Sequence, residues 1–157
     1  MNKIMEKQYP IYKLYQQMRL NIFDVMDDSD LAFSPPNCPT LGGLCVQIGE
    51  WQHAYIDSFK TFKQDFNFRQ PDASMTGSTE KLKAWFGAMD AELLAALEAL
   101  NDEDIDTKVV DKGGWEASLP WNLDIYKECI IIFFTKAWVY LRIMGRPLPK
   151  GWDHWIS

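Results

Sequence analysis

The chain of 157 residues carries 16 basic and 22 acidic side chains, which gives a formal charge of -6 at neutral pH. This length is enough for one hydrophobic core and predicts a single domain over residues 1–157. The acidic balance, with no basic stripe, excludes the electrostatic attraction on which nucleic-acid binding depends.

Membrane insertion and export are also not expected. The longest apolar run, residues 129–134, is far shorter than the roughly 20 residues that span a bilayer. The first residues lack the apolar stretch and the cleavage site of a secretory signal. The three cysteines Cys38, Cys45 and Cys129 form no CxxC pair and are expected to be reduced thiols, as in a cytoplasmic protein.

The first predicted helix starts at Pro10, a residue that fits the first turn of a helix. Its apolar residues recur every three or four positions, which places them on one helical face: Ile11, Leu14, Tyr15, Met18, Ile22 and Val25. The acidic residues 27–30 and the prolines of residues 34–39 supply no such period, so a loop is expected there.

The second predicted helix begins after Thr40, whose hydroxyl can cap the first turn. About six amphipathic turns follow, with apolar residues Leu41, Leu44, Cys45, Ile48, Tyr55, Phe59 and Phe62. Gly42, Gly43 and Gly49 lower its intrinsic helix propensity. Their placement agrees with close helix packing and equally with chance.

Residues 67–78 form a long connection for a compact bundle and predict a crossover. A third helix then opens near Ser78 or Thr79 and has the strongest helix-forming composition of the chain, around residues 91–97. Its apolar residues continue at helical spacing: Leu82, Trp85, Phe86, Met89, Leu93, Leu97 and Leu100.

Residues 101–120 contain Gly113 and Gly114, and only residues 107–110 favour a short extended piece. The fourth predicted helix runs from about Asn122 to Met144, and Gly145 with Pro147 ends it. Beyond it, Trp152 and Trp155 are expected to fold back over one end of the bundle rather than meet a partner chain.

Four amphipathic segments with almost no alternating pattern predict an all-α four-helix bundle, because each helix must cover its apolar stripe with the others. The long connection would lie between the second and third helices. No internal repeat and no domain boundary is found within the chain.

Two segments resemble the DinB/YfiT-like superfamily. Residues 40–55, TLGGLCVQIGEWQHAY, are similar to the family pattern Leu-x-His-Ile-x-x-x-Glu of the second helix. Residues 140–149, YLRIMGRPLP, are similar to the Tyr-Leu-Arg-x-x-Gly-x-x-Pro ending of the fourth. The resemblance covers nearly the whole chain and implies the same bundle with the same long crossover.

Members of this family typically bind a divalent metal through one histidine on the second helix and two histidines on the fourth, four residues apart. The resemblance puts Gln47 at the first position and, within about one residue, Cys129 and Phe133 at the other two. A phenyl ring cannot ligate a metal, and the chain holds only two histidines, His53 and His154. A family-type metal site is therefore excluded within one chain, and no metal or other cofactor is expected.

Two other sets of residues remain as candidate metal ligands. His53 lies six residues beyond Gln47, roughly 240° around an ideal helix, and a surface or packing role is favoured over a ligand role. Cys129, Glu50 or Glu128 could serve as replacement ligands, but no closely spaced ligand pair supports this. The apolar neighbours of Cys129 favour an inert thiol.

No HExxH, P-loop, GxGxxG or GxSxG pattern is present. The favoured hypothesis is a metal-free bundle of undetermined activity that binds a small organic ligand or another protein, as a homodimer through the broad helix faces. The expected ligand pocket is lined by Gln47, Trp51, Cys129 and Phe133. The alternative is an enzyme of the metal-dependent thiol-transferring or isomerising kind with non-histidine ligands.

Overall fold

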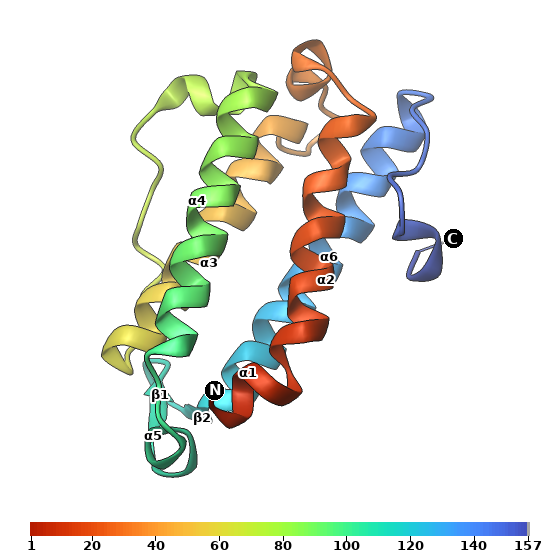
Figure 1. Ribbon diagram of the computed structural model, residues 1–157. Coiled ribbons are helices and arrows are strands. Elements are labelled where there is room, and N and C mark those ends of the chain that lie inside the picture. Colours follow the sequence, from red (N-terminus) through yellow and green to blue (C-terminus); the bar gives the residue numbers. More distant parts are fainter. Residues whose placement is uncertain (157) are drawn as a thin grey trace.

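The computed structural model describes residues 1–156 and is built almost entirely from helices (Figure 1). The helices are α1 (Lys3–Lys7), α2 (Tyr9–Leu20), α3 (Leu41–Thr61), α4 (Thr79–Glu98), α5 (Asp102–Thr107) and α6 (Leu119–Ile143). Short 3-10 turns cover Asn21–Asp24, Asp28–Ala32, Ala73–Gly77 and Trp152–His154, and β1 (Val109–Asp111) pairs antiparallel with β2 (Glu116–Ser118). No helix of residues 1–156 is both long and apolar enough to cross a membrane.

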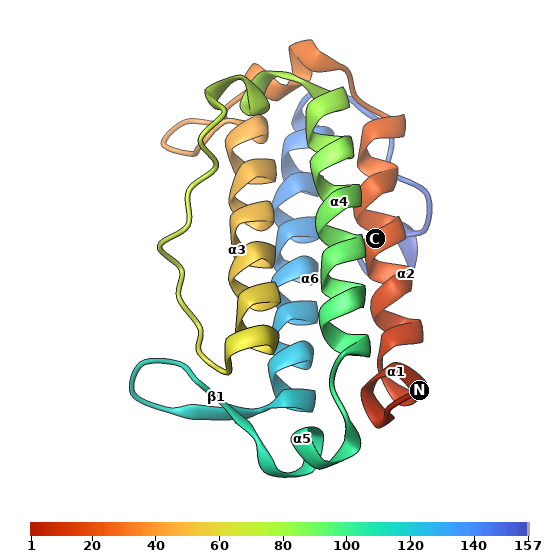
Figure 2. The ribbon, with the colours of Figure 1, turned by 60° about the vertical axis from the view of Figure 1, so that its left-hand side comes forward.

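The four long helices α2, α3, α4 and α6 form a bundle in which each packs against two neighbours. Around the bundle the order is α2, α6, α3, α4, so that α2 and α3 lie diagonally opposite (Figures 1 and 2). Because α3 and α4 run in the same direction, the chain between them returns along the full length of the bundle (Figure 2). The predicted four-helix architecture and its long crossover are both confirmed.

All the helices except α2 begin where a side-chain oxygen accepts from a free amide of the first turn. Thr40 accepts from the amide of Gly43 at 3.0 Å, as predicted, and Ser78 and Ser118 cap α4 and α6 in the same way. At the end of α6, Gly145 adopts a left-handed conformation with φ of 71°, a backbone state that costs glycine little.

The loop of residues 25–40 is tied to the end of α6. The Arg146 guanidinium donates to Asp27 at 3.0 Å and to Asp30 at 2.9 Å, and the Tyr140 hydroxyl donates to the carbonyl of Pro39 at 2.8 Å. These contacts give the motif that closes the fourth helix a structural role, since they hold the first long connection against the bundle.

The first predicted helix differs from the observed one in length and in its buried face. α2 ends at Leu20 and passes into a 3-10 turn, so the regular helix does not reach Val25. Ile11 and Leu14 are about half exposed, whereas Gln16 and Arg19 are buried. The apolar spacing was misleading because two polar residues of this helix are paired or enclosed in the bundle interior.

Smaller differences concern the ends of elements and the short elements between them. α6 starts at Leu119, three residues before the expected Asn122, and Phe62 caps α3 in a left-handed conformation instead of continuing it. The extended piece expected near residues 107–110 is β1 of a small hairpin. The helices α1 and α5 were not expected.

The C-terminal tail folds back onto the bundle, as expected. Trp152 is fully buried, and its indole nitrogen donates to the carbonyl of Met18 at 2.7 Å. Its ring lies 4.6 Å from that of Phe134, between centroids. Trp155 stays about half exposed and meets Tyr15 edge to face.

Candidate functional site

The four residues expected to line a pocket do meet at one place between α3 and α6. Gln47 and Trp51 lie one turn apart on α3, and Cys129 and Phe133 lie one turn apart on α6. Together with Lys136 at the rim they line a cleft, called the α3/α6 cleft below. Gln47 is exposed, Trp51 and Cys129 are half-buried, and Phe133 is buried.

The α3/α6 cleft is nearly filled by its own side chains. Its volume is about 10 Å³, close to the lower limit of about 10–15 Å³ that a single water molecule needs. A larger molecule can enter only if a side chain at the rim moves, and the exposed Gln47, Ile132 and Lys136 and the half-buried Trp51 line the cleft.

The donor atoms at the cleft do not fit a divalent metal. They are an amide and a thiol, with a phenyl ring opposite, whereas divalent metals take imidazole, thiolate or carboxylate ligands. Burial raises the pKa of the Cys129 thiol, although the Tyr55 hydroxyl beside it acts in the other direction, so the protonated form is favoured. Within residues 1–156 no three His, Cys, Asp or Glu side chains gather closely enough to hold a metal.

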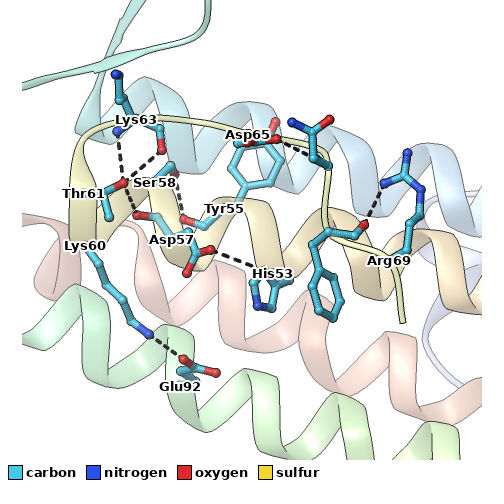
Figure 3. Close-up of polar contacts among 12 residues, drawn as sticks. His53, Tyr55, Asp57, Ser58, Lys60, Thr61, Lys63, Asp65, Arg69 and Glu92 are labelled. Carbon is cyan, nitrogen blue, oxygen red and sulfur yellow. Dashed lines mark hydrogen bonds and ion pairs between the residues drawn. The ribbon is translucent and has the colours of Figure 1, made fainter. Parts of the chain in front are cut away.

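His53 and Glu50 contact the crossover instead of the cleft. The His53 ring stacks on Phe68 with 3.9 Å between centroids, and its Nδ1 lies 3.4 Å from the Asp57 carboxylate (Figure 3). Glu50 accepts a hydrogen bond from the backbone amide of Gln70 at 2.9 Å. Both residues therefore hold the crossover against α3, which agrees with the packing role expected for His53.

A lysine from the hairpin approaches Cys129 from the other side. Lys112 bonds to the side chain of Gln64, and its ammonium lies 4.9 Å from the centre of the Tyr55 ring. The Tyr55 hydroxyl lies 3.9 Å from the Cys129 sulfur. Desolvation lowers the pKa of Lys112 to about 8, despite the nearby Cys129, which acts to raise it.

The bundle interior contains a polar cluster that the sequence analysis missed. Arg19 of α2 is fully buried and donates to Asp90 of α4 at 2.6 Å, to Gln52 of α3, and to the Tyr126 hydroxyl of α6 at 3.3 Å. Gln52 also donates to Asp90, at 2.8 Å. We call these four residues the central brace, because each comes from a different helix of the bundle.

The electrostatics of the central brace favour a charged arginine. Burial acts to lower the pKa of Arg19, but the attraction and hydrogen bond of Asp90, together with Tyr126 and Tyr12, outweigh it, and the pKa lies above its ordinary value. The guanidinium also lies 4.2 Å from the centre of the Phe86 ring. One signal could have identified Arg19, since it stands seven residues after Tyr12 and four after Tyr15, on the buried face of α2.

Comparison with solved structures identifies the architecture. A DinB-like protein from Bacillus cereus superposes with a TM-score of 0.75 at 17% sequence identity, over 90% of this chain and 93% of the other. A DinB-like protein from Bacillus subtilis gives 0.68 at 17% identity, over 86% and 90%. The chain has the DinB-like fold. No family model and no curated protein sequence matches the chain.

The fold brings to one cleft the residues that the family motifs single out in the sequence. Gln47, Cys129 and Phe133, which the resemblance puts at the histidine positions, are among the residues that line this cleft. At 17% identity these two structures show that the backbone fold is shared, and they do not show that the chemistry of the site is shared.

Proposed function

We propose that this DinB-like bundle is a metal-free binding protein and that the α3/α6 cleft receives a small organic ligand. The observation that carries the proposal is the convergence of Gln47, Trp51, Cys129 and Phe133 on one cleft whose donors do not suit a metal. Two aromatic walls and one amide favour a flat, mainly apolar molecule with a single hydrogen-bonding group. Entry requires a lining side chain such as Trp51 to turn outward, because the closed cleft has room for about one water molecule.

Metal analysis separates this proposal from the enzyme alternative. Purified protein is incubated with zinc, nickel or manganese, desalted, and measured by inductively coupled plasma mass spectrometry. We expect far less than one equivalent of any metal. A stoichiometric metal whose retention is lost in Cys129→Ser would instead support an enzyme with replacement ligands.

Ligand binding at the cleft is tested by a fragment screen that follows backbone amide NMR shifts. Flat aromatic fragments should shift the signals of Gln47, Trp51 and Phe133, and Gln47→Ala should weaken binding at least fivefold. Lys83→Ala, an exposed change on α4, is the matched control and should leave the affinity unchanged. If no fragment shifts the cleft signals in a saturable manner, the ligand proposal is wrong.

We also propose that the chain forms a homodimer, and one surface feature supports this. Ile132, Val139 and Ile143 are 49%, 41% and 58% exposed and follow one another at helical spacing along α6, beside the cleft. An exposed apolar stripe of this kind is typical of an interface. We expect a dimer by light scattering coupled to gel filtration, converted to a monomer by Val139→Glu but not by Ala88→Glu, an exposed change on α4. The self-association proposal is wrong if the wild-type protein is still a monomer at about 100 μM, a concentration on the order of the Kd of a weak dimer.

A further inference from the structure

A second and larger recess lies on the opposite side of the bundle from the α3/α6 cleft. It is a groove between α2 and α4, the two helices that face the reader in Figure 1, with a volume of about 530 Å³. Volumes of roughly 300–1,000 Å³ are usual for small-molecule sites. Its walls include Leu14, Leu20 and Leu94, and Asp90 and Gln16 also line it.

The polar side chains of this α2/α4 groove have free hydrogen-bonding capacity. Gln16 is only 5% exposed, and its Nε2 has no hydrogen-bond partner among residues 1–156. A buried donor without a partner is costly, and native proteins rarely keep one without a ligand or a water molecule. The terminal torsion of glutamine is broad, so the amide can turn into the groove.

Asp90 supplies the complementary acceptor. Arg19 and Gln52 both donate to its Oδ1, and no donor within residues 1–156 reaches its Oδ2. The carboxylate is 15% exposed, on the groove side, while its partner Arg19 is fully enclosed. The groove therefore presents the free Oδ2 of Asp90 to a ligand, whereas the Arg19 guanidinium beside it is enclosed and cannot contact a ligand.

The charges around the groove select against ionic ligands. The negative charge of Asp90 is already balanced by Arg19, and Lys13 at the rim adds a positive charge. Because the Arg19–Asp90 pair has no net charge, a cation gains little from Asp90 and meets the positive charge of Lys13, whereas an anion would place its charge against the exposed carboxylate oxygen of Asp90. A neutral head with one donor and one acceptor avoids both penalties.

We propose that the α2/α4 groove binds a neutral small molecule with a carboxamide head and an apolar body. The N–H of the head donates to Asp90 Oδ2, its carbonyl accepts from Gln16 Nε2, and the body packs against Leu14 and Leu94. This site is separate from the α3/α6 cleft and does not depend on the function proposed there.

Three probes with the same phenyl body and different heads test the proposal on the full chain: benzamide, benzylammonium and benzoate. Binding is followed by NMR shifts of backbone amides and leucine methyl groups. We expect saturable binding of benzamide with a Kd on the order of 1–10 mM, a range reasonable for nine heavy atoms. Shifts should centre on Leu14, Gln16 and Leu94, and both charged probes should bind at least tenfold more weakly.

Two variants and two controls complete the test. Gln16→Met removes the free donor without breaking any existing bond, so it should fold normally and weaken benzamide binding at least fivefold. Ala91→Phe fills the groove and should abolish binding, whereas Ala88→Phe on the same helix, outside the lining, should not. Gln47→Ala, in the other cleft, should have no effect.

The proposal is overturned if benzamide gives no saturable shifts at the groove. It is equally overturned if benzylammonium or benzoate binds as well as benzamide, or if Gln16→Met binds benzamide with unchanged affinity. Each of these results leaves the α3/α6 cleft proposal untouched, because its screen reports on different residues.

Discussion

Arg19 is the residue on which the central brace depends. Its guanidinium is fully buried and donates a hydrogen bond to one side chain from each of the other three long helices. A buried ion pair contributes little net stability compared with apolar side chains of the same size, but removing only one partner leaves an uncompensated charge. The brace therefore makes the four helices dependent on one another.

Arg19→Met tests this dependence. Loss of the guanidinium leaves the Asp90 carboxylate unpaired, and we expect the free energy of unfolding to fall by about 3 kcal/mol. That figure is the lower end of the usual range, because Asp90 keeps 15% exposure to water. Urea unfolding followed by circular dichroism measures the change.

A double variant provides the control for charge. Arg19→Met with Asp90→Leu replaces the ion pair by apolar groups and should be more stable than Arg19→Met alone. Lys83→Met removes an exposed positive charge from α4 and should change stability by less than about 0.5 kcal/mol. Asp90→Leu is measured alone as well. If the double variant loses as much stability as Arg19→Met and Asp90→Leu lose together, the two residues are not coupled as described.

The candidate site illustrates what the sequence can and cannot predict at the level of residues. Gln47 with Trp51, and Cys129 with Phe133, were expected to meet because residues four apart share a helical face, and they do line one cleft. That the cleft binds a ligand stays a prediction. Its small volume was not predictable, because it depends on how Trp51 and Phe133 pack across two helices.

At the scale of elements, α3 begins unusually close to the end of the crossover. A Cβ added at Gly42 would overlap the backbone carbonyl of Thr76 and come within 3.2 Å of the Leu31 carbonyl oxygen. Only a residue without a side chain lets the 3-10 turn Ala73–Gly77 pack against the first turn of α3. The glycine therefore sets the distance between the two elements.

Gly42→Ala is expected to lower the free energy of unfolding by about 2 kcal/mol, since backbone atoms must shift to accept the methyl group. The matched control is Gly87→Ala in α4, where nothing lies within 4 Å of the added Cβ. That change should stabilise by about 0.5–1 kcal/mol through helix propensity. Thermal and urea unfolding of both variants measure the difference, and a neutral Gly42→Ala would contradict the close contact.

The long elements could be predicted from the sequence, whereas the short ones could not. Caps such as Thr40 and Ser78 are local features and marked the starts of α3 and α4 correctly. Helix α5 and strand β2 cover six and three residues. Their existence depends on contacts with the rest of the bundle, because segments this short have little intrinsic stability.

At the scale of the whole molecule, the C-terminal tail belongs to the core. Trp152 lies beyond the last long helix, yet it is fully buried, and it contacts Met18 of α2 and Phe134 of α6. The tail therefore joins the same folding unit as the bundle. Its burial was expected from the sequence, but the hydrogen bond to α2 was not.

Trp152→Ala should lower the free energy of unfolding by about 3–5 kcal/mol, the usual cost of emptying a buried tryptophan site. Trp152→Phe keeps an aromatic ring and loses the bond to Met18, so a loss of about 1–3 kcal/mol is expected. Trp155→Ala is the control, because that ring is 44% exposed and its removal should cost less. Equal losses for the two alanine variants would show that the tail is not part of the core.

The diagonal arrangement of the helices has a consequence for how the chain matures during synthesis. The N-terminal half supplies α2 and α3, the C-terminal half supplies α4 and α6, and each helix packs mainly against helices of the other half. Neither half can bury the apolar stripes of its two long helices alone, because α2 and α3 make few contacts with each other, as do α4 and α6. During synthesis α3 can pack against α4 as soon as both helices have left the ribosome, whereas α2 lacks its main long-helix partner until α6 follows, so the bundle cannot close before residues 119–143 are available.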